Sequence, residues 1–130
     1  MKLYVVTGMP CSGKTTYVKE NMKSGDIVFD TDEIVRAFTY SKNHTVNKEG
    51  VVPFILKLRY IWLRELKTMP VKGDAWLIAS NITDSLKKNF RIYEHEIIEM
   101  DTDKETCIER LYKDKSRPDK KEWEKIILEY

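Results

Sequence analysis

Residues 8–15 read Gly-Met-Pro-Cys-Ser-Gly-Lys-Thr, which is a complete G-x-x-x-x-G-K-S/T phosphate-binding loop. The apolar run Leu-Tyr-Val-Val at residues 3–6 comes directly before this loop, and residues 15–21 continue without Gly or Pro, as a helix would. A buried strand before the motif and a helix after it are what separate a true phosphate-binding loop from a chance match. The segment therefore predicts a nucleotide-binding site.

Each part of the loop has a chemical role. Gly8 and Gly13 let the backbone curl so that successive N–H groups point inward at the positive end of a helix. Lys14 is expected to reach the β- and γ-phosphates of ATP, and the hydroxyl of Thr15 to be an oxygen ligand for Mg²⁺. The residues expected to bind ATP are Gly8, Pro10, Cys11, Ser12, Gly13, Lys14, Thr15 and Thr16.

Length and composition restrict what can surround the loop. A chain of 130 residues is expected to form a single domain, residues 1–130. It has 23 basic and 21 acidic residues, so the net charge of +2 gives no general indication of nucleic acid as a partner. Cys11 and Cys107 lack metal-binding spacing, and a reducing cytoplasm suits a thiol inside a phosphate loop. No apolar stretch approaches the ~20 residues that span a bilayer, so no membrane association is expected.

Apolar runs and helical periods alternate along the chain. Strands are predicted at residues 2–7, 26–29, 75–79 and about 93–100, the last as an edge strand. Helices are predicted at residues 15–23, 51–69, about 83–90, 102 to before 116, and 119–130, with residues 39–50 as a mobile loop. Thr102 and Glu105 have capping-box spacing, and the last helix is expected to bury Trp123, Ile126, Ile127 and Tyr130. This alternation predicts a three-layer α/β domain with a short, about four-stranded parallel sheet.

The residues opposite the γ-phosphate decide which reaction a phosphate loop serves. A GTPase needs an Asn-Lys-x-Asp signature, and residues 47–50 and 89–91 lack its Asp. A hydrolytic ATPase needs an acid at the end of an apolar strand, but the strand at 75–79 continues Ser80-Asn81. Asp32 follows the second strand, with Arg36 one helical turn later, and this pair supplies a base for an acceptor hydroxyl and a cation for an acceptor phosphate. Capping of the next helix is the alternative role for Asp32.

These motifs, in this order, resemble the 5′-polynucleotide kinases of bacteriophage type among the P-loop kinases, over most of the chain. The similar segments are residues 8–15, Asp30-Thr31-Asp32-Glu33 with Arg36, Lys48-Glu49-Gly50-Val51, Ser80-Asn81-Ile82, and Glu109-Arg110 onward. Ala79 stands where the family has an acid, which leaves Ser80 and Asn81 for acceptor contacts. The resemblance implies that Asp32 is the general base toward a 5′-hydroxyl, that Arg36 holds a nucleic-acid phosphate, and that Arg110 is a lid arginine that stabilises the transferring phosphoryl group.

The predicted function is therefore transfer of the γ-phosphate of ATP to a hydroxyl, with the 5′ end of DNA or RNA as the favoured acceptor. Lys14, Asp32 and Arg110 are the expected catalytic residues, and Arg36, Ser80 and Asn81 the expected acceptor-binding residues. A nucleotide or other small-molecule kinase, and an ATP-binding regulatory module, stay open as alternatives. Because Cys11 lies among inward N–H dipoles, a lowered thiol pKa and a reactive Cys11 are also expected. The sequence leaves the oligomeric state open.

Overall fold

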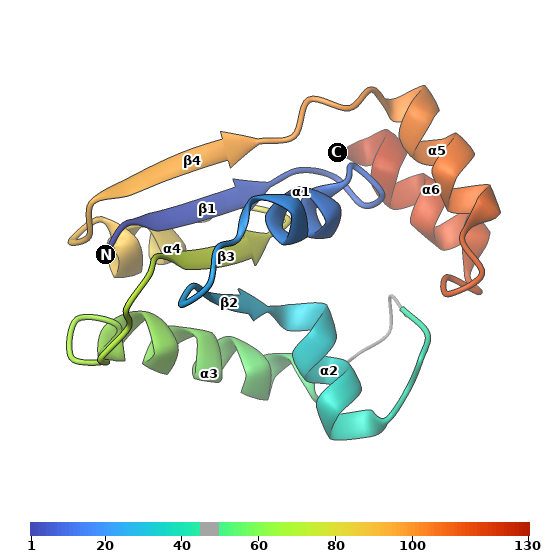
Figure 1. Ribbon diagram of the computed structural model, residues 1–130. Coiled ribbons are helices and arrows are strands. Elements are labelled where there is room, and N and C mark those ends of the chain that lie inside the picture. The colour runs from blue at the N-terminus through green and yellow to red at the C-terminus, as the bar shows by residue number, and fades with distance from the viewer. Residues whose placement is uncertain (45–49) are drawn as a thin grey trace.

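The computed structural model describes residues 1–44 and 50–130, and within them the sheet has the predicted parallel architecture. Four strands, β1 (Leu3–Thr7), β2 (Ile27–Asp30), β3 (Ala75–Ala79) and β4 (His95–Glu99), pair in the order β2-β3-β1-β4. All three pairings are parallel, with Leu3 opposite Ala75 and His95, and Ile27 opposite Ala75. In Figure 1 the four arrowheads point toward the end of the sheet where α5 and α6 lie.

In the described part of the chain, six helices lie between the strands or after the last strand. Their bounds are α1 Lys14–Asn21, α2 Thr31–Thr39, α3 Val52–Glu65, α4 Asp84–Phe90, α5 Lys104–Lys113 and α6 Lys120–Glu129. The prediction from sequence is confirmed for the strands and for the edge position of β4, with differences of one to a few residues at the ends. Residues 45–49, which belong to the predicted mobile loop and include the Lys48-Glu49 pair of the family resemblance, lie outside the described residues.

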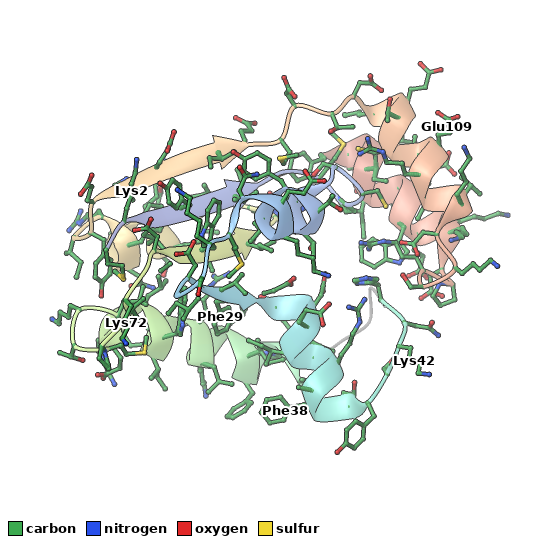
Figure 2. The ribbon with its side chains drawn as sticks, in the orientation of Figure 1. Lys2, Phe29, Phe38, Lys42, Lys72 and Glu109 are labelled. Carbon is green, nitrogen blue, oxygen red and sulfur yellow. The ribbon has the colours of Figure 1, made fainter. Side chains whose placement is uncertain are left out.

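Alternating strand residues face two separate apolar clusters, and this makes the domain three-layered. On one face, Val5 and Leu77 pack with Ile55 and Leu63 of α3 and with residues of α2 and α4. Phe29, labelled in Figure 2, belongs to this cluster, and its ring centroid is 5.4 Å from that of Trp62 on α3. On the other face, Val6, Trp76 and Ile78 pack against Val18 of α1. A third cluster of Cys107, Leu111, Trp123 and Ile127 holds α5 to α6.

Three local predictions need correction. The N-cap of α2 is Asp30, whose Oδ1 accepts from the Asp32 N–H at 3.1 Å, so Asp32 lies in the first turn and does not cap the helix. The N-cap of α5 is Asp103, which accepts from the Thr106 N–H at 2.7 Å, because the Thr102 hydroxyl donates instead to the Ser12 carbonyl. Ile126 and Tyr130 are exposed, and the residues of α6 that are buried against α5 are Trp123 and Ile127.

The carboxyl ends of β1, β2 and β3 bring together the segments that carry the predicted chemistry. The phosphate loop follows β1, α2 begins directly after β2, and Ser80-Asn81 follows β3. The outer part of α2 and the segment after it, marked by Phe38 and Lys42 in Figure 2, extend from the same edge of the sheet. Ligands of parallel α/β sheets bind at this edge. Within residues 1–44 and 50–130, no helix has the length and apolarity that a membrane crossing requires.

Candidate active site

The phosphate loop is a strained turn that opens toward the first turn of α1. Gly13 has φ 97° and is the N-cap of α1, and Cys11 also has a positive φ of 64°. A side chain at Gly8 would meet the Ser12 hydroxyl at 2.7 Å, so the curl needs glycine there. Among the described residues no side chain caps α1, and the buried Ser12 Oγ has no hydrogen-bond partner. N–H groups at an uncapped helix start and an orphaned hydroxyl suit the phosphate oxygens of a nucleotide.

Lys14 is folded back over the loop that it belongs to. Its Nζ donates to the carbonyl oxygens of Gly8 at 2.5 Å and Met9 at 2.9 Å. Burial and, secondarily, the positive charge of Arg117 lower the pKa of Lys14 from 10.5 to about 8, although the Asp32 carboxylate acts in the opposite direction. Burial removes water from around the Lys14 ammonium group and so destabilises its positive charge. A bound phosphate anion would stabilise that charge again.

Asp30, which was not among the site residues expected from the sequence, has its carboxylate beside Thr15. Asp30, the last residue of β2, is buried, and the Thr15 hydroxyl donates to its Oδ2 at 3.5 Å. Burial and, next, the nearby Asp32 raise the pKa of Asp30, and hydrogen bonds from the backbone of Asp32 and Glu33 act in the opposite direction. Its place at the carboxyl end of a strand was the available sequence signal. Thr15 and Asp30 together supply the oxygen ligands that suit Mg²⁺, which is bound in such sites by one or two carboxylates plus phosphate oxygens.

One cavity of about 970 Å³ extends over the carboxyl edge of the sheet and gathers most of the predicted site. Residues 10–16 of the loop line it, together with Asp32, Arg36, Ser80 and Asn81. Gly8 contributes through its carbonyl contact with Lys14. In the described part of the chain no cluster of three or more His, Cys, Asp or Glu side chains could hold a metal by itself. A metal in this cavity would therefore depend on nucleotide oxygens as well as on protein ligands.

His44 joins the two predicted acceptor-side residues. Its Nδ1 is 3.4 Å from Asp32 Oδ2, and its Nε2 contacts Arg36 Nη2. Because Arg36 can only donate, Nε2 must accept, and the proton of a neutral imidazole then lies on Nδ1, facing Asp32. The His44 N–H also donates to the Ser116 carbonyl at 2.6 Å. His44 was not among the residues expected in the site, since a lone histidine in a polar segment carries no signal for such a contact.

The lid arginine predicted from sequence and a second arginine occupy different places. Arg110 Nη1 donates to the Cys11 carbonyl at 3.2 Å and lines a smaller hollow on the other side of the loop. Arg117 lines both this hollow and the main cavity, with its side chain 11% exposed. It pairs with Asp114 Oδ2 at 3.1 Å and lies 4.4 Å above the Trp123 ring. Arg117 is thus the residue of the α5–α6 region that lies nearer to Lys14 and the cavity.

The expectation of a lowered thiol pKa at Cys11 is wrong. Burial raises the pKa of the Cys11 thiol above its ordinary value, and the opposing charge of Arg117 only partly offsets this effect. The loop dipoles that motivated the prediction do not reverse the desolvation of the thiolate. A thiol whose pKa lies above its ordinary value stays protonated near neutral pH.

Arg59 of α3 also lines the cavity. It is partly buried, and burial alone lowers its pKa. A helical arginine between apolar residues gives no sequence signal of a binding role, so this residue too was missed.

No family model matches the chain. UPF0200 proteins from two strains of Methanococcus maripaludis, S2 and C6, are 27% and 28% identical to it over 137 residues, which cover 98% of the chain and 75% of each relative. Among solved structures, shikimate kinase from Acinetobacter baumannii in complex with shikimate matches with a TM-score of 0.57 and 22% identity, over 98% of this chain and 74% of that chain. The resemblance to phage-type polynucleotide kinases stays a prediction. The chain has a P-loop kinase-like α/β fold.

Proposed function

We propose that this protein is an ATP-dependent phosphotransferase that moves the γ-phosphate of ATP to a hydroxyl group. One observation carries the proposal: Lys14 of the phosphate loop and Asp32 of α2 line the same cavity, together with the polar residues that follow β3. Lys14 is suited to the donor phosphates, whereas Asp32 comes from a different element, and its carboxylate is suited to orienting an acceptor hydroxyl. A protein that binds ATP without transferring its γ-phosphate has no need for the Asp32 carboxylate in this cavity.

In the proposed reaction the acceptor oxygen forms a bond to the γ-phosphorus while the bond from that phosphorus to the β–γ bridging oxygen breaks. Asp32 orients the acceptor hydroxyl and takes its proton, and ADP leaves with the bridging oxygen. Lys14 offsets negative charge on the equatorial oxygens of a loose transition state. Mg²⁺, held by Thr15 and Asp30, would neutralise charge on the β- and γ-phosphates. Arg117, and on the other side of the loop Arg110, are the cations available to the leaving nucleotide.

The favoured acceptor is the 5′-hydroxyl of a polynucleotide. The order of the motifs along the chain supports this acceptor, and so does Arg36, which lies one turn after Asp32 on the cavity side of α2. In this role Arg36 contacts a phosphate of the nucleic acid, while Ser80 and Asn81 contact the terminal nucleotide.

A small-molecule kinase is the second candidate, and the cavity wall favours it. Val52 and Pro53 of α3 and Ile126 of α6 give the cavity apolar sides next to its charged groups. Its volume of about 970 Å³ lies at the upper end of the range of small-ligand sites, which extends to about 1,000 Å³. The structural neighbour named above carries a small acceptor, shikimate.

An acceptor panel with γ-labelled ATP tests both candidates. The acceptors are 5′-hydroxyl DNA and RNA oligonucleotides, a nucleoside 3′-monophosphate, the free nucleoside and shikimate, with Lys14→Met as the inactive control. Label on the oligonucleotides supports the favoured acceptor, and label confined to small molecules supports the second candidate. Label released only as inorganic phosphate, or no turnover at all, contradicts the phosphotransferase and leaves an ATPase or a regulatory binder.

A further inference from the structure

The cationic side chains that line the cavity differ in whether a salt bridge or hydrogen bond already compensates their charge. Arg36 pairs with Glu33 and contacts His44. Arg117 pairs with Asp114 and stacks on Trp123. Lys14 donates to two loop carbonyls. Lys19 also lines the cavity, but it is exposed to solvent. Arg59 is half-buried, and the described residues offer its guanidinium neither a salt bridge nor a hydrogen bond.

The position of Arg59 on α3 makes this lack of partners unusual. Arg59 is seven residues after Val52 and four after Ile55, so it lies on the helix face that carries apolar contacts to the core. Arg64 on the same helix is 53% exposed and pairs with Glu65, as surface arginines commonly do. A charged group on an inward face without a partner is destabilising, and such groups are normally paired. Burial alone lowers the pKa of Arg59, with no carboxylate raising it.

The surroundings of Arg59 indicate where a compensating anion would bind. Arg59 shares the cavity with Val52 and Pro53 of its own helix and with Asp32 and Arg36 of α2. In Figure 1, α2 and α3 lie below the sheet, on the side away from α5 and α6. This is the side on which the acceptor, not the nucleotide, is placed by the proposed function. A guanidinium group offers parallel N–H donors that match the two oxygens of a carboxylate or a phosphate.

We propose that Arg59 is an anion-binding residue of the acceptor site and that the acceptor carries a carboxylate or phosphate group in addition to the hydroxyl that is phosphorylated. The inference rests on the proposed function and narrows its substrate class to anionic hydroxyl compounds. A nucleoside 3′-phosphate, as found at the 5′ end of a polynucleotide, and a small hydroxy acid both meet this description. Neutral nucleosides and sugars do not.

Binding measurements test the anion site without any turnover. The full chain is saturated with ADP and Mg²⁺ so that the phosphate loop is occupied, and matched probes are titrated by calorimetry: adenosine 3′-monophosphate against adenosine, and D-glycerate against glycerol. We expect at least one anionic probe to bind ~10-fold or more tightly than its neutral partner. Arg59→Gln should remove that advantage, Arg59→Lys should keep part of it, and Arg64→Gln, the control on the same helix, should leave it unchanged. The pair that shows the advantage identifies the source of the anion.

Thermal unfolding separates a binding role from a structural one. Because residues 1–44 and 50–130 give the charge of Arg59 no partner, Arg59→Met should unfold at the same temperature as the native chain or higher. A clear fall in the unfolding midpoint of Arg59→Met would mean that Arg59 stabilises the fold, and would overturn the proposal.

The proposal is also overturned if neither anionic probe binds more tightly than its neutral partner, or if the advantage persists in Arg59→Gln. These failures are distinct from failure of the proposed function. An Arg59-dependent advantage in a chain that phosphorylates no acceptor keeps the anion site and removes the kinase. If the chain phosphorylates an acceptor but its preference for anions does not depend on Arg59, the kinase stands and the anion site at Arg59 is removed.

Discussion

Replacement of Asp32 by Asn is the sharpest test of the phosphotransferase, because the structure separates its catalytic effect from its effect on stability. Asp32 lies in the first turn of α2, and the cap of that helix is supplied by Asp30. Its carboxylate is 37% exposed and faces His44 Nδ1 at 3.4 Å. The substitution keeps the shape of the side chain and removes only its charge and basicity.

The two expected magnitudes differ widely. A polar contact with this exposure contributes at most about 1 kcal/mol, so the unfolding midpoint should fall by less than about 5 °C. A positioned general base contributes ~10²–10⁴-fold to turnover, which corresponds to about 2.7–5.4 kcal/mol of transition-state stabilisation. Affinity for ATP should stay within a few-fold of the native value, because the loop contacts are untouched.

The assay measures kcat for transfer from γ-labelled ATP to whichever acceptor the panel identifies, with the thermal midpoint and ATP affinity as controls. Glu33→Gln is the matched variant, because Glu33 lies in the same turn and pairs with Arg36. We expect a loss of kcat for Asp32→Asn that greatly exceeds the loss for Glu33→Gln. A folded Asp32→Asn variant with near-native kcat would refute the role of Asp32 and most of the argument for a kinase.

Four further changes test other parts of the site. Lys14→Ala should weaken ATP binding by about 1.5–3 kcal/mol, measured by calorimetry, and should reduce turnover more strongly; native transfer by this variant would contradict the loop assignment. Folding lowers the pKa of Lys14 from 10.5 to about 8, so between these pH values the native chain binds fewer protons than the unfolded chain. The contribution of Lys14 to the free energy of unfolding should therefore increase as pH rises from about 8 to 10.5. Urea titrations at both ends of this range should show this increase in the native chain and not in Lys14→Met. Asp30→Asn keeps the cap of α2 but removes a proposed Mg²⁺ ligand, so the Mg²⁺ concentration at half-maximal activity should increase ~10–100-fold while the thermal midpoint hardly changes. Iodoacetamide should label Cys11 more slowly in the native chain at neutral pH than in the urea-unfolded chain, as read by peptide mapping; equally fast labelling would show that burial does not raise its thiol pKa.

The sequence by itself determined the fold class and the position of the phosphate loop. Both are set by local physics: strands such as Ala75–Ala79 are continuous apolar runs because they are buried on both faces, and the loop needs glycine where no side chain fits. Ends of elements were less predictable, since nearby Ser, Thr and Asp residues compete for the same N–H groups. Asp103 therefore caps α5 while Thr102 binds the Ser12 carbonyl, although the capping-box spacing favoured Thr102.

Only the tertiary structure decided which distant groups meet and how burial changes them. Asp30 contacts Thr15 because β2 ends next to the start of α1, and His44 reaches Asp32 and Arg36 from beyond the end of α2. The raised thiol pKa of Cys11 likewise depends on burial that no local pattern reports. The proposal for Arg59 depends most strongly on the tertiary structure, because it rests on a charge for which the described residues provide no partner. A sequence motif predicts interactions within one segment of the chain. Burial, and the pairing of charges across the cavity, depend on which distant segments the fold brings together.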